Sequence, residues 1–159
     1  LYMMEDVYFY LTLFLNIDSI YYMSTPIYHY YYNVNSATKS VKRYTKNIDG
    51  IIEVNKKIKK TLLENKMFSG ENIAKLNANH LKIITNYFYF LMRDEIEGNK
   101  EIIKKYILSE KFQEILKDTN ISNIPLKNKI MINLIKHNKI YLLYIFNRLV
   151  SHISKLIGK

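Results

Sequence analysis

The sequence predicts a mainly helical chain with one short two-stranded β element near its start. Glycine (4) and proline (2) are scarce among the 159 residues, so loops should be short and helices long. After residue 38, apolar residues recur at steps of three and four, which is the spacing of helices that bury one face. Before residue 38, two short segments rich in Ile and Tyr are typical of strands.

The first expected helix begins at the acidic pair Glu5-Asp6, which opens a mostly apolar run that reaches Leu15. Carboxylates in the first turn of a helix are stabilised by the helix dipole and by the free backbone N–H groups. Two interpretations follow. The pair either only stabilises the start of the helix, or it holds an ionised carboxylate that can remove a proton from a hydroxyl group in a pocket.

Two aromatic strands are expected next, at Ser19 to Met23 and at Ile27 to Tyr32. Pro26 separates them, because proline cannot donate a hydrogen bond to a sheet. Residues 33–38 then form a polar loop with turn-forming residues. Nine of the 15 tyrosines fall before this loop, and they either stack on sugar rings or fill the core of a small sheet.

These elements, in this order, resemble the C-terminal part of the catalytic domain of family 2 glycosyltransferases of the bacterial polysaccharide type. That family has the GT-A α/β fold, with a Glu-Asp-x-x-Phe helix, a Pro-Leu-Tyr-x-Tyr-Arg strand and a loop with Asn-Ser. The similar segments here are Glu5-Asp6-Val7-Tyr8-Phe9, Pro26-Ile27-Tyr28-His29-Tyr30-Tyr31 and Asn35-Ser36-Ala37-Thr38. Tyr31 stands where an Arg is common in the family.

The resemblance implies transfer of a sugar, with inversion, from a nucleotide-sugar donor to a hydroxyl of a glycan or lipid-linked acceptor. Asp6 would be the catalytic base with Glu5 beside it, and His29, Asn35 and Ser36 would bind substrate. A divalent metal, Mg²⁺ or Mn²⁺, would offset the charge of the leaving diphosphate. The family's metal motif, Asp-x-Asp, occurs nowhere in this chain, so the metal ligands would lie outside it.

The chain begins with Leu1 and lacks that motif, so we expect it to be the C-terminal portion of a longer enzyme, inactive alone. Residues 1–66 would complete the GT-A catalytic domain, and residues 67–159 would form an appended helical bundle.

Six further helices are expected from the apolar spacing. Gly50 lies inside the first, at a cost of about 1 kcal/mol relative to Ala. His80 lies beside the apolar stripe of the second, where a structural histidine is the preferred interpretation. Ser109 caps the fourth and Pro125 opens the fifth. Their ranges are 39–67, 71–92, 99–108, 109–118, 126–136 and 139–157.

Charge is divided along the chain. Residues 1–38 hold three acids and no Lys or Arg, whereas the rest holds all 24 basic residues and 11 acids. No acid follows Asp118, and seven basic residues do. The run Ile140 to Phe146 is too short to span a bilayer. Two alternatives remain open for residues 126–157: a cationic amphipathic segment on an anionic membrane surface, or a helix packed in its own bundle.

The absence of cysteine fits a reducing compartment, so a cytoplasmic location is expected, with peripheral contact at the inner membrane face. A second hypothesis is a non-enzymatic basic helical module that binds a membrane surface or an acidic partner. Nucleic-acid binding ranks last, because the lysines are dispersed and no recognition motif is present.

Overall fold

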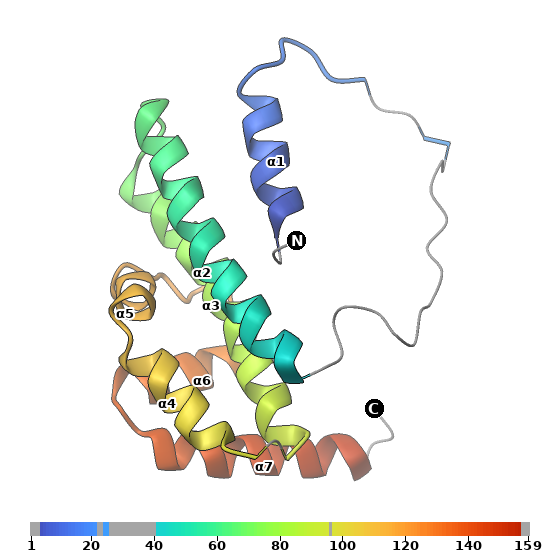
Figure 1. Ribbon diagram of the computed structural model, residues 1–159, viewed down its shortest axis with the longest axis vertical. Coiled ribbons are helices and arrows are strands. Elements are labelled where there is room, and N and C mark those ends of the chain that lie inside the picture. The colour runs from blue at the N-terminus through green and yellow to red at the C-terminus, as the bar shows by residue number, and fades with distance from the viewer. Residues whose placement is uncertain (1–3, 22–23, 26–40, 96, 157–159) are drawn as a thin grey trace.

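A computed structural model describes residues 4–21, 24–25, 41–95 and 97–156 of the chain. The described residues form seven helices (Figure 1). In chain order these are α1 (Glu5–Phe14), α2 (Val41–Glu64), α3 (Gly70–Arg93), α4 (Asn99–Leu108), α5 (Glu110–Lys117), α6 (Leu126–Lys136) and α7 (Ile140–Leu156).

The predicted β element, and with it the GT-A α/β fold, is wrong for this structure: the part of the chain that is described contains helices and no strand. Ser19 to Tyr21, the described part of the first expected strand, is neither helix nor strand, and the Tyr21 side chain is 93% exposed. Strand propensity acts through pairing with a neighbouring strand, and no strand among the described residues pairs with this segment. Residues 22–23 and the second expected strand, Ile27 to Tyr32, lie outside the described residues.

The helices expected from the apolar spacing after residue 38 are present, with ends within a few residues of those predicted. Local signals explain these ends. The Ser69 hydroxyl accepts a hydrogen bond from the Asn72 backbone N–H at 3.1 Å and so caps α3. The Ser109 hydroxyl caps α5 through the Phe112 N–H at 3.4 Å.

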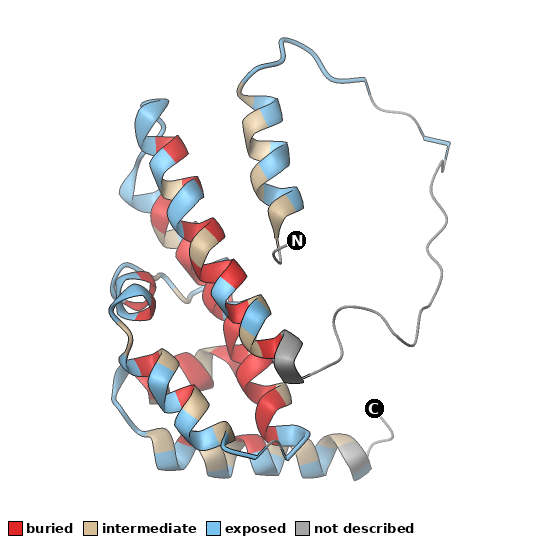
Figure 2. Cartoon of the chain, viewed as in Figure 1, coloured by how far each residue is buried: buried red, intermediate tan, exposed pale blue. Residues whose placement is uncertain are grey.

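Helix α3 is the centre of the molecule, because α2, α4, α5, α6 and α7 all pack against it. Figure 2 shows the buried residues gathered along α2 and α3 and on the inner sides of the later helices. One apolar cluster joins residues from both sides of residue 66, including Ile48, Ile51, Leu81, Ile84, Phe88, Ile103, Phe112, Met131 and Leu143. Helix α1 packs chiefly against α2 and contains no buried residue.

A buried polar network joins α2 to α3 inside this apolar packing. The Asn55 amide donates to Asn77 Oδ1 at 3.1 Å and lies 2.8 Å from His80 Nδ1. His80 is 1% exposed, and burial, with the Lys59 ammonium as a second cause, lowers the pKa of His80 from 6.5 to about 4. The His80 imidazole is therefore neutral in the folded protein, which agrees with the prediction of a structural histidine.

The low pKa of His80 predicts a loss of stability in mild acid. The unfolded chain binds a proton at His80 below pH 6.5 and the folded chain binds it only near pH 4. The free energy of unfolding should therefore fall between these values, by about 1.4 kcal/mol per pH unit and about 3 kcal/mol in all. Urea unfolding of the wild type and of His80→Gln across this range measures the difference in slope. The exposed His152→Gln is the control, and equal slopes in all three proteins would contradict the prediction.

Candidate functional site

The predicted catalytic pair lies in the first turn of α1. Glu5 is half-buried and Asp6 is exposed. Asp6 Oδ1 accepts a hydrogen bond from the backbone N–H of Val7 at 2.9 Å, which agrees with a role in stabilising the start of the helix. Neither residue lines the cavity described below. The predicted substrate-binding residues His29, Asn35 and Ser36 lie outside the described residues.

Helix α7 carries an apolar surface on two sides. Its inner side packs on α3 and α6, with Leu143 and Asn147 fully buried. Its other side, which we call the outer face of α7, runs along one edge of the molecule and remains exposed (Figures 1 and 2). Six apolar side chains, each between 40% and 77% exposed, make up the outer face of α7: Tyr141, Leu142, Ile145, Leu149, Ile153 and Leu156.

The spacing along α7 explains why these side chains share one face. Leu142, Ile145 and Leu149 follow one another at steps of three and four, and Ile153 and Leu156 continue the series, so they form one stripe on the helix. The helix has 17 residues, which makes the stripe about 25 Å long. A surface helix normally presents polar residues to solvent, and a continuous exposed apolar patch marks a site of interaction.

Basic residues border this face. Arg148 and His152 are exposed on α7, and Lys139 is exposed just before its start. No acid follows Asp118 in the sequence, so α6 and α7 contribute no carboxylate, and Glu95, which lines the same cavity as Arg148, comes from the end of α3. The outer face of α7 is thus apolar along its length and cationic at its edge and its beginning.

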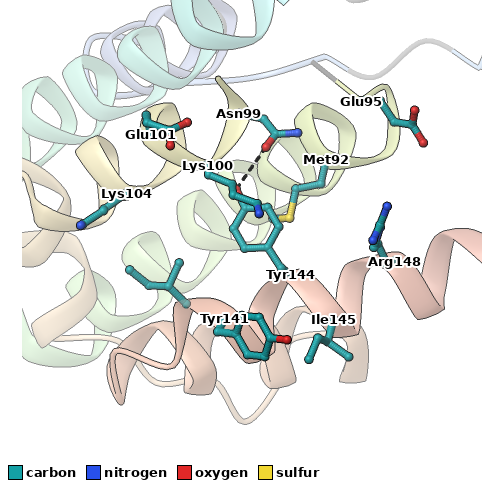
Figure 3. A pocket seen from close by; sticks show the side chains of 11 residues that line it. Met92, Glu95, Asn99, Lys100, Glu101, Lys104, Tyr141, Tyr144, Ile145 and Arg148 are labelled. Atoms are coloured by element: carbon teal, nitrogen blue, oxygen red, sulfur yellow. Dashed lines mark hydrogen bonds between the residues drawn. The ribbon is translucent and has the colours of Figure 1, made fainter. Parts of the chain in front are cut away.

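A cavity of about 600 Å³ opens between α4 and α7, near the end of α3 (Figure 3). It shares Tyr141 and Ile145 with the outer face of α7. Its charged lining consists of the cations Lys100, Lys104 and Arg148 and the acids Glu95 and Glu101.

Tyr144 fixes the geometry at the middle of this cavity. Its hydroxyl donates to Asn99 Oδ1 at 3.3 Å, and the Lys100 ammonium lies 5.2 Å from the centre of its ring (Figure 3). The Asn99 amide in turn donates to the Leu91 carbonyl of α3 at 3.4 Å. Burial, followed by the negative charge of Glu101, raises the pKa of Tyr144. The phenol therefore stays protonated at neutral pH and holds α7 to the start of α4.

A smaller hollow of about 360 Å³ lies beside the cavity and shares Met92, Glu95 and Arg148 with it. Asn147 lines this hollow and is 1% exposed. Its amide nitrogen donates to the Leu143 carbonyl at 2.8 Å, whereas its Oδ1 has no hydrogen-bond partner among the described residues. A buried acceptor without a partner is uncommon in folded proteins.

Comparisons of the chain with protein-family models, curated proteins and solved structures found no match. Among the described helices, none is both long and apolar enough to cross a bilayer. No group of three or more His, Asp or Glu side chains suited to a metal ion occurs in the described ranges.

Sequence reasoning pointed to the basic tail but missed the cavity. The exposed stripe had a readable signal, the second series of apolar residues in the expected helix 139–157. The cavity had none, because Lys100 and Lys104 are more than 40 residues from Arg148 in the sequence and meet it only through the packing of α4 and α7.

The hydrogen bond between Tyr144 and Asn99 predicts that removing the Tyr144 hydroxyl lowers the stability of the protein. Tyr144→Phe keeps the ring under Lys100 and removes the hydroxyl, so the free energy of unfolding should fall by about 1 kcal/mol. Urea denaturation measures this. Tyr141→Phe is the matched control, because the Tyr141 side chain is 77% exposed, and its stability should not change. A Tyr144→Phe protein as stable as the control would show that this hydrogen bond does not hold α7 to α4.

Proposed function

We propose that this chain is a peripheral membrane-binding module, which lies on an anionic lipid surface through the outer face of α7. The observation that carries the proposal is the stripe of six exposed apolar side chains bordered by basic residues. Amphipathic helices at a membrane surface place apolar side chains below the headgroups and cations at their level.

Each part of this face suits a lipid surface. Burial of a whole Leu or Ile side chain contributes about 1.5–3 kcal/mol as an upper value, and a Lys or Arg near anionic headgroups adds about 1 kcal/mol. Arg148 can extend its guanidinium group toward the lipid headgroups while the carbon chain of its side chain stays on the apolar surface. A second copy of the chain is a poorer partner, since two faces of the same positive charge would repel one another.

The cytoplasmic leaflet of a cell membrane is the anionic one, so the proposed location is the cytoplasmic face. This proposal takes the non-enzymatic alternative among the hypotheses drawn from the sequence. Glycosyl transfer by a longer protein, with Asp6 as base, stays a separate prediction. The GT-A fold no longer supports it, because the described residues form only helices.

Removing apolar surface from the outer face of α7 should weaken membrane binding. We expect Leu149→Gln with Ile153→Gln to lower partitioning onto vesicles of phosphatidylcholine and phosphatidylglycerol by about tenfold or more, which corresponds to about 1.4 kcal/mol. Vesicle flotation measures bound and free protein. Added salt should weaken binding of the wild type, because it screens exposed charges.

The matched control is Leu63→Gln with Met67→Gln, which removes two similarly exposed side chains near the turn between α2 and α3, at the other end of the molecule (Figure 1). The control should bind vesicles as the wild type does. Circular dichroism checks that both variants keep their helices. Wild-type protein that stays unbound, or equal losses in the two double variants, would contradict the proposal. Salt-sensitive binding to an acidic protein without binding to vesicles would favour an acidic partner instead.

A further inference from the structure

We propose that the cavity between α4 and α7 binds the headgroup of an anionic phospholipid, specifically a phosphodiester that carries free hydroxyl groups, as in phosphatidylglycerol. This inference rests on the proposed membrane contact and names the lipid chemistry that the same site selects. The cavity volume of about 600 Å³ lies within the range of small-molecule sites, about 300–1,000 Å³.

The position of the cavity links it to the lipid surface. Tyr141 and Ile145 belong both to the wall of the cavity and to the outer face of α7. A lipid whose acyl chains lie against that face can therefore place its covalently attached phosphate in the cavity. The headgroup and the outer face of α7 would then lie at the same depth in the membrane surface.

Cations from two helices line the cavity. Lys100 and Lys104 come from α4, and Arg148 comes from α7. Both side-chain types bind phosphate, lysine as a point charge and arginine through its planar fork of donors. The ring of Tyr144 lies 5.2 Å from the Lys100 ammonium, an attraction that holds this cation beside the cavity before any ligand arrives.

Two carboxylates at the site favour a ligand that carries hydroxyl groups as well as a phosphate. Glu95 and Glu101 also line the cavity, and Figure 3 shows them at opposite sides of the view with Lys100 and Tyr144 between them. Together with the three cations they leave a charge of only about +1, which suits a phosphodiester with a single negative charge. Carboxylates accept hydrogen bonds from hydroxyl groups.

The test separates recognition of the phosphatidylglycerol headgroup from general attraction to negative charge. Binding is measured by flotation on two sets of phosphatidylcholine vesicles with equal surface charge, one containing phosphatidylglycerol and the other a diacylglycerol hemisuccinate, whose charge is a carboxylate. We expect the wild type to bind the phosphatidylglycerol vesicles about tenfold more tightly. Only this lipid offers the cations a phosphodiester without a cationic group beside it, and only this lipid offers hydroxyl groups to Glu95 and Glu101. Lys100→Gln with Lys104→Gln should abolish this preference.

The control is Lys46→Gln with Lys56→Gln, which removes the same charge from exposed positions on α2 and should keep the preference. Equal binding of the wild type to both vesicle types would overturn the headgroup site and leave the proposed membrane contact intact. Absence of binding to either type would overturn both. A titration with glycerol 3-phosphate, followed by NMR, tests whether the cavity binds a dissolved phosphate ester in place of a lipid headgroup. Tight binding of this free phosphate ester without vesicle preference would show that the site serves a dissolved ligand and not a lipid.

Discussion

The fold depends on the burial of α3, in which 12 of the 24 residues are buried. Five helices pack against it, so its buried polar side chains must find partners within the protein. Asn77 and His80 do so with Asn55 of α2. The Asn128 amide of α6 donates to the Thr85 hydroxyl at 2.9 Å. Such contacts are directional, and they set the register of α2 and α6 on α3 where apolar packing alone would allow helices to slide.

The placement of α7 follows from this arrangement. Helices α3 and α6 cover only its inner side, and the start of α4 is held to it through Tyr144 and Asn99. The remaining side has no cover within the described part of the chain, although its side chains are as apolar as those of the core. The same helix therefore contributes to the stability of the fold with one face and offers an interaction surface with the other.

The helices could be predicted from the sequence because an apolar spacing of three and four, with Ser109 and Pro125 at helix starts, is local information. The strand at Ser19 to Met23 was predicted from Tyr and Ile content alone, and such content cannot supply the neighbouring strand on which a sheet depends. The basic tail was visible as seven charges after Asp118. The cavity required knowing that α4 and α7 lie side by side, which is a property of tertiary packing.

The loose attachment of α1 has a consequence for how the molecule opens. Its partly buried Tyr8 and Leu11 touch a small cluster of four buried residues that is separate from the main core: Val54, Ile58, Leu62 and Ile73. Little free energy opposes the departure of a helix with no fully buried side chain. Amide hydrogens of α1 should exchange with solvent through local opening, whereas those at the middle of α3 exchange only when the whole domain unfolds.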